Sequence, residues 1–205
     1  MKRTALYFLG AAALALGLLS AYLTLGTKAS APKFEAVDIT GVDWGKSFEL
    51  TDHSGHKRTL ADFRGKAVTL FFGYTHCPDM CPTTMAKLGE TMKLLGGDAQ
   101  RVQGLFVTVD PQRDTPQVLA QYVPAFYPTF LGLFADPETI ARTAKEFKVY
   151  YHAQAPNDQG SYTVDHSGQI LVFDPEGRLR LMMKPEQAPE SMAHDLRALL
   201  HQAAG

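Results

Sequence analysis

Residues 68–82 read VTLFFGYTHCPDMCP and contain the only two cysteines among the 205 residues, Cys77 and Cys81. The apolar run at the start of this stretch is typical of a central parallel strand that is covered on both faces. A helix is predicted to follow from about Pro82, because proline is favoured in the first turn of a helix. The stretch therefore predicts a strand that leads into a helix, with both thiols in the first turn of that helix.

Strands and helices alternate on either side of this stretch. Strands are predicted at 48–51, 57–60, 68–72, 102–109, 131–134, 169–173 and 179–183. Helices are predicted at 82–95, from 115 to about 127, at 137–147 and at 189–202, while residues 150–161 are interpreted as a polar loop. This order predicts an α/β chain with a thioredoxin-like fold, a mixed β-sheet flanked by helices. In open α/β sheets, sites form beyond the carboxyl ends of the strands, which is where both cysteines are expected.

The N-terminus predicts a membrane anchor. Lys2 and Arg3 precede a run without charged residues from Thr4 to Thr27. A helix of that length reaches about 36 Å, enough to cross a hydrocarbon core of about 30 Å. The two basic residues favour the cytoplasmic side for this end, so the rest of the chain is expected on the other side. The alternative is a cleaved signal peptide, for which residues 29–31, Ala-Ser-Ala, would be the cleavage site.

The chain is accordingly divided into an N-terminal transmembrane helix at 1–27, a tether at 28–45 and one thioredoxin-like domain at 46–205. We expect a single-pass protein of the inner (cytoplasmic) membrane with its soluble domain in the periplasm. The net charge is −1 and no basic block occurs, so no nucleic-acid partner is expected. An extracytoplasmic compartment favours oxidised thiols, which makes the role of the cysteines the central question.

The cysteine pair allows several interpretations. A spacing of four lets helical geometry bring both side chains to one face, and a helix N-terminus favours the thiolate. A structural disulfide here would close a very short loop and stabilise the fold by only about 2 kcal/mol. A thioredoxin-type oxidoreductase usually has two residues between its cysteines and a cis-proline facing them, and no proline lies between Pro156 and Pro175. A peroxiredoxin would carry threonine in place of Tyr74.

A histidine far along the chain completes a possible metal site. Residues 162–167, Tyr-Thr-Val-Asp-His-Ser, lead into the predicted strand at 169–173, so His166 is expected where a cis-proline loop would face the cysteines. Two thiolates and one imidazole form a soft set of three ligands that suits copper(I), whereas structural zinc normally has four. Asp165 is a candidate for orienting the ring. The predicted metal ligands are Cys77, Cys81 and His166.

Other residues near the motif are expected to have structural roles. His76 adjoins Cys77, but adjacent side chains rarely point together, and Met80 is expected to pack against a loop. Asp110 and residues 113–116 fit a capped turn between a strand and a helix. The remaining histidines are expected to be solvated: His53, His56, His152, His194 and His201.

Three segments together resemble the Sco (SenC) family of copper chaperones for cytochrome c oxidase assembly. They are Thr75–Pro82 (THCPDMCP), Val109–Pro116 (VDPQRDTP) and Tyr162–Ser167 (YTVDHS). The anchor and the length of the domain fit the same family.

The resemblance implies a thioredoxin-like fold in which Cys77, Cys81 and His166 bind copper. It also implies a membrane-anchored metallochaperone that delivers copper to the copper-A subunit of cytochrome c oxidase. The alternative is a thiol–disulfide oxidoreductase, with Cys77 and Cys81 as its redox-active pair, that reduces the cysteines of that subunit or of another extracytoplasmic partner. Thioredoxin-like reductants are then possible further partners. Copper needs the reduced dithiol, so a disulfide would switch copper binding off.

Overall fold

The computed structural model describes residues 33–202. The predicted transmembrane helix at 1–27 lies outside the described residues, as does the first part of the predicted tether. Within the described part of the chain, no helix combines the length and the apolar character needed to cross a membrane. The compact unit begins at Phe34, so residues 34–45 of the predicted tether belong to the folded domain.

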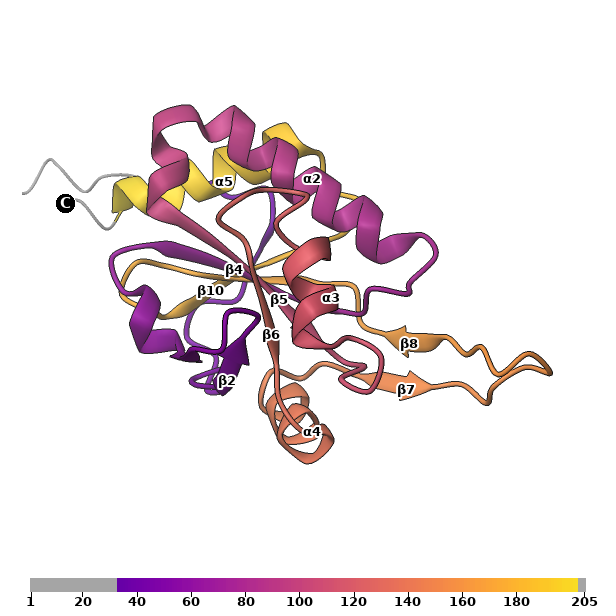
Figure 1. Ribbon diagram of the computed structural model, residues 1–205. Coiled ribbons are helices and arrows are strands. Elements are labelled where there is room, and N and C mark those ends of the chain that lie inside the picture. The colour runs from indigo at the N-terminus through magenta and orange to yellow at the C-terminus, as the bar shows by residue number, and fades with distance from the viewer. Residues whose placement is uncertain (1–32, 203–205) are drawn as a thin grey trace, which may run out of the picture. The chain divides into compact units, whose positions relative to one another are not determined.

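The domain contains a mixed sheet of eight strands. Figure 1 shows this sheet at the centre, with helices around it. The spatial order of its strands is β1 (Val37–Asp38), β10 (Leu179–Met183), β9 (Ile170–Phe173), β4 (Ala67–Gly73), β5 (Val102–Thr108), β6 (Leu131–Phe134), β2 (Glu49–Asp52) and β3 (Lys57–Thr59). Strands β4, β5 and β6 are parallel, and the others pair antiparallel. The predicted mixed sheet flanked by helices is confirmed.

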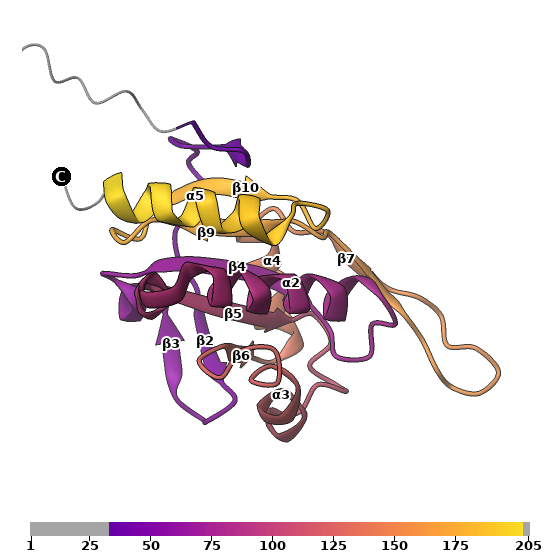
Figure 2. The same ribbon diagram turned by 90° about the horizontal axis from the view of Figure 1, so that it is seen from above.

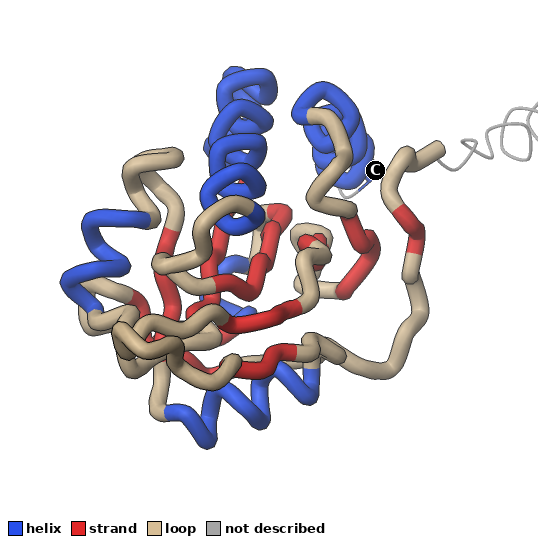
Figure 3. The backbone as a smooth tube through the Cα atoms, turned by 90° about the vertical axis from the view of Figure 1, so that its right-hand side faces the viewer, coloured by secondary structure: helices blue, strands red, loops and turns tan. Residues whose placement is uncertain are grey.

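Helices cover the sheet on both faces. Helices α2 (Met80–Leu95) and α5 (Pro189–Gln202) lie side by side on one face, as Figure 2 shows from above. Helix α4 (Pro137–Glu146) covers the opposite face, and α3 (Pro116–Tyr122) lies beside β6. In Figure 3 the strands lie between these helical layers. Two 3-10 helices, Leu60–Phe63 and Gly96–Arg101, complete the helical elements of the described residues.

The two central parallel strands set the position of the site. Every residue of β4 and of β5 is buried, which explains why both segments are mostly apolar, with Thr69, Gln103 and Thr108 as buried polar exceptions. Their register pairs Gly73 with Thr108 at the carboxyl ends. The loop that follows each strand therefore starts at the same edge of the sheet, and the loop after β4 carries the cysteine motif.

The structure differs from the sequence-based prediction at two helix ends. Helix α2 begins at Met80, so Cys77 lies in the preceding loop and not in the first helical turn. Helix α3 ends at Tyr122, earlier than the predicted end near residue 127. Pro124 accounts for the early end, because proline has no amide hydrogen to continue the helical ladder, although Val123 before it still has helical geometry and donates to the Leu119 carbonyl.

The predicted polar loop at 150–161 is wrong in part. Its first residues form β7 (Tyr151–Ala153), which pairs antiparallel with β8 (Val164–His166) in a separate two-stranded sheet. We call residues 151–166 the arm. It projects beyond the main sheet in Figures 1 and 2. His166 is the last residue of β8, where the arm returns to the domain.

Candidate metal site

A short loop and the first turn of α2 hold the two cysteines together. The Cys77 amide donates to the Tyr74 carbonyl at 3.3 Å, which turns the chain back after β4. The Cys81 amide then donates to Cys77 Sγ at 3.4 Å. Cys77 is half-buried and Cys81 is fully buried, and both are free thiols. The two sulfurs therefore meet although only Cys81 is helical.

Gly73, the last residue of β4, leaves room for the buried sulfur. A Cβ atom at this position would lie 2.9 Å from Cys81 Sγ and 2.9 Å from the Phe106 ring. Neither neighbour has space to withdraw, because both are fully buried. Glycine is thus required here for close approach of the Cys81 side chain to the strand.

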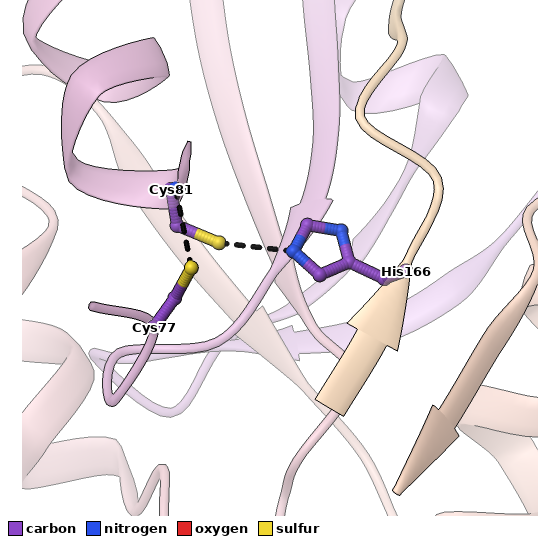
Figure 4. Close-up of side chains that lie close together, drawn as sticks. All are labelled: Cys77, Cys81 and His166. Atoms are coloured by element: carbon purple, nitrogen blue, oxygen red, sulfur yellow. Dashed lines mark hydrogen bonds between the residues drawn. The ribbon is translucent and has the colours of Figure 1, made fainter. Parts of the chain in front are cut away.

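His166, at the end of β8, faces the two sulfurs (Figure 4). Its Nε2 atom lies 3.1 Å from Cys81 Sγ. The ligand atoms of Cys77, Cys81 and His166 all lie within 4.8 Å of one another. The rings of Phe71 and Tyr74 hold the imidazole edge-on, with centroid distances of 6.0 and 5.9 Å. The structure therefore brings together all three of the predicted metal ligands.

The Ser167 carbonyl sets the tautomer of His166. It lies 3.0 Å from Nδ1 and can only accept a hydrogen bond, so Nδ1 carries the proton and the Nε2 lone pair faces the sulfurs. Asp165, the predicted orienting residue, does not have this role. Its side chain is exposed and accepts a hydrogen bond from Gln154.

Burial dominates the proton affinities at the site. It raises the pKa of the Cys81 thiol, and this effect outweighs the thiolate-favouring helix terminus that the sequence suggested. Burial also lowers the pKa of His166 and keeps its ring neutral. Without metal, the Cys81 thiol therefore donates to a neutral imidazole, and a soft metal ion that binds both must displace the thiol proton.

Asp114 fastens the cysteine loop to the end of β5. Its buried carboxylate accepts hydrogen bonds from the Thr75 amide at 3.0 Å, the Thr75 hydroxyl at 2.6 Å and the Thr108 hydroxyl at 2.6 Å. Helix α3 is capped by Thr115 instead, which accepts from the Val118 amide. Sequence reasoning assigned this segment to a capped turn and missed its link to the cysteine loop. A helix cap needs only one side-chain oxygen, and Thr115 provides it. The presence of Asp110 and Asp114 in the same segment was therefore the sequence signal for a further role.

The remaining residues near the motif lie around the site and not in it. His76 is exposed, with Nδ1 3.1 Å from the Thr75 hydroxyl. Met80 packs against a loop as predicted, since a Cβ atom on Gly168 would lie 2.8 Å from its sulfur. His53 is not simply solvated: it is half-buried, and its Nδ1 accepts from the Gly132 amide at 3.0 Å. The other four histidines predicted to be solvated are exposed.

Comparison with known proteins identifies the same family that the sequence motifs resemble. The sequence profile of the SCO1/SenC family matches residues 37–201. "Protein SCO2 homolog, mitochondrial" of Bos taurus is 43% identical over 145 residues, which cover 70% of this chain and 54% of that protein. The chain thus spans about half the length of the curated relatives it matches.

Solved structures with a similar fold include ScoI of Bradyrhizobium japonicum with copper bound. It is 39% identical, with a TM-score of 0.70, and the match covers 75% of this chain and 98% of that one. Apo Sco1 of Thermus thermophilus is also 39% identical, with a TM-score of 0.73 and coverage of 82% and 97%.

Proposed function

The chain belongs to the SCO1/SenC family, and from this premise we propose that it binds copper through Cys77, Cys81 and His166 and delivers it to the copper-A subunit of cytochrome c oxidase. One observation carries the proposal. His166 lies 85 positions after Cys81 in the sequence, yet its Nε2 atom is 3.1 Å from the Cys81 sulfur. The fold thus brings an imidazole from a distant part of the chain beside two thiols. This favours a site in which the three side chains bind one metal ion over a chance contact.

The donor set fits copper(I) in number, softness and spacing. Ligand atoms around a trigonal ion with bonds of about 2.0 to 2.3 Å lie about 3.5 to 4.0 Å apart. The three atoms already lie within 4.8 Å of one another, so small side-chain movements suffice to close the site. Bradyrhizobium japonicum ScoI, with 39% identity, has been solved with copper bound, which supports the choice of metal.

The difference in exposure between the two cysteines indicates the side on which copper reaches the site. Cys81 is fully buried, whereas Cys77 is half-buried and stands before the helix. We infer that copper enters and leaves on the Cys77 side, where thiolates of a recipient subunit can replace the ligands one at a time. The charge-free run from Thr4 to Thr27 supports a single-pass anchor that would hold the domain in the periplasm, beside a membrane-bound recipient.

The same exposure difference favours one further candidate function, a thiol–disulfide reductase. The Cys77 thiolate would attack a disulfide of the partner and release one of its thiolates. The released partner thiolate would take the proton of the Cys81 thiol, and the Cys81 sulfur would then attack the Cys77 sulfur, release the second partner thiolate and leave a disulfide between Cys77 and Cys81. Two electrons pass to the partner, so a thioredoxin-like dithiol must reduce the chain again before another cycle.

His166→Ala separates the two functions. We expect the variant to lose at least tenfold in copper(I) affinity, equivalent to about 1.4 kcal/mol, measured on the reduced full chain by competition with a chromogenic copper(I) chelator. Exchange with a small aromatic disulfide should continue, because it needs only Cys77 and Cys81. His152→Ala is the matched control, since His152 is an exposed histidine on the same arm. Parent-like copper affinity in His166→Ala would remove the histidine from the proposed ligand set.

A further inference from the structure

Arg113 connects the loop after β5 with the arm that carries His166. Its Nε atom donates to the Asp110 carboxylate. Its Nη1 atom donates to the Tyr162 carbonyl at 2.8 Å, and its guanidinium carbon lies 3.6 Å from the centre of the Tyr162 ring. The Tyr162 hydroxyl closes the group by donating to Asp110 at 2.9 Å. A single side chain thus contacts both the backbone and the ring of one residue in the arm.

The side chains of the arm alternate between two faces, so the contact of Arg113 with Tyr162 also affects the orientation of His166. Successive residues of a strand point to opposite faces, so Val164 and His166 share one face of β8. Tyr162 precedes β8 by two residues, and the bond from the Gln154 amide to the Thr163 carbonyl at 2.8 Å continues the strand pairing toward it. Burial follows the same alternation: Tyr162, Val164 and His166 are buried or half-buried, while the residues between them are exposed. Holding Tyr162 against the domain therefore fixes the face that His166 presents to the sulfurs.

The guanidinium also approaches the other side of the imidazole site. It lies 5.6 Å from the centre of the Tyr74 ring, and that ring packs edge-on against His166. Arg113 is only 21% exposed, and its Nη2 atom is buried without a hydrogen-bond partner among the described residues. A buried unpaired donor is unfavourable, so the position of the side chain depends on its contacts with Asp110 and with the two tyrosine rings.

We propose that Arg113 is a positioning residue that docks the arm against the domain and thereby holds His166 within reach of the two sulfurs. The inference rests on the proposed copper site. If only a fraction of molecules has the arm docked, the apparent dissociation constant rises by the inverse of that fraction. Arg113 therefore acts on copper affinity only through His166.

A double-mutant cycle on the reduced full chain tests this. We expect Arg113→Ala to weaken copper(I) binding about tenfold when His166 is present, corresponding to a docked fraction of about one in ten. In the His166→Ala background the same substitution should change affinity by less than twofold, because two sulfurs then bind copper whether or not the arm is docked. An equal loss in both backgrounds, or no loss in either, would overturn the proposal.

A metal-free measurement guards against a variant that merely unfolds. The edge-on rings of Phe71 and Tyr74 should shift the His166 ring-proton signals away from those of a free histidine. In Arg113→Ala these signals should move toward free values, while the signals of core methyl groups stay unchanged. Unchanged His166 signals in a folded variant would also contradict a positioning role.

Graded variants and a matched control complete the test. Arg113→Lys keeps the charge but loses the planar donor geometry, so it should recover only part of the affinity. Tyr162→Phe removes the bond to Asp110 but keeps the ring, so its effect should be smaller than that of Arg113→Ala. Arg142→Ala is the control, because Arg142 pairs with Glu138 on the exposed side of α4 and should leave affinity unchanged.

The double-mutant cycle also distinguishes a wrong role for Arg113 from a wrong set of copper ligands. If His166→Ala alone leaves copper affinity unchanged, the proposed ligand set is wrong. The ring-proton signals of His166 in Arg113→Ala then still decide whether Arg113 docks the arm. If His166→Ala weakens binding and Arg113→Ala does not, only the role of Arg113 is wrong.

Discussion

At the scale of single residues, the buried sulfur of Cys81 depends on the absence of a side chain at Gly73. A methyl group there would come 2.9 Å from both that sulfur and the Phe106 ring. We expect Gly73→Ala to lower the free energy of unfolding by about 1–3 kcal/mol through overpacking. It should also weaken copper binding, because the Cys81 sulfur would be displaced from its position beside His166.

Chemical denaturation and the chelator competition would measure both effects. Gly97→Ala is the matched control, because a Cβ atom there meets nothing within 4 Å. If Gly73→Ala matched the parent in stability and copper affinity, the close packing of Cys81 on β4 would be refuted.

The grouping of Cys77, Cys81 and His166 could be predicted from the sequence, but the contacts that support it could not. Cys77 and Cys81 are close in the chain, and the placement of His166 before a predicted strand was enough to bring it to the same edge of the sheet. The orienting group of His166 is the backbone carbonyl of Ser167, which no residue type reveals. The role of Asp114 depends on tertiary contact with Thr75, so the sequence alone suggested a helix cap.

At the scale of elements, the long buried strands were the most predictable and the arm was the least. Strands β4 and β5 are mostly apolar because both of their faces are covered. The arm is a two-stranded ribbon whose tip is exposed, so no apolar alternation marked its first strand, β7. Strand β1 was missed for a related reason: it has only two residues, Val37–Asp38, and its place in the sheet comes from pairing with β10.

The N-terminal segment is joined to α5 by one buried carboxylate. Asp195 is fully buried and accepts hydrogen bonds from the amides of Glu35 at 2.9 Å and Ala36 at 2.8 Å. Asp195→Ala would leave both amides without this acceptor. We expect the free energy of unfolding to fall by about 2–3 kcal/mol, the usual size for hydrogen bonds to a charged group. Amide hydrogen exchange should become faster in residues 35–38.

The control for this variant is Glu190→Ala, because Glu190 lies on the same helix with an exposed side chain. Copper affinity should be unchanged in both variants. Parent-like stability and exchange in Asp195→Ala would show that the segment is held by its strand pairing alone.

At the scale of the whole molecule, two parts of the fold place the three ligands together. They are the central parallel strands β4 and β5 and the arm, which comes much later in the sequence. The sheet supplies the rigid edge at which the cysteine loop begins, and the arm brings the imidazole to it. Copper binding is then a property of the assembled domain, since the ligands come from β8, from α2 and from the loop before α2. Unfolding or undocking the arm would leave only the two local thiols.

X-ray absorption at the copper edge of the full chain, loaded with one equivalent of copper(I) under reducing conditions, tests the central claim most directly. The account predicts two sulfur neighbours and one nitrogen neighbour, with the nitrogen lost in His166→Ala. Coordination by sulfur alone in the parent chain, unchanged in the variant, would contradict it.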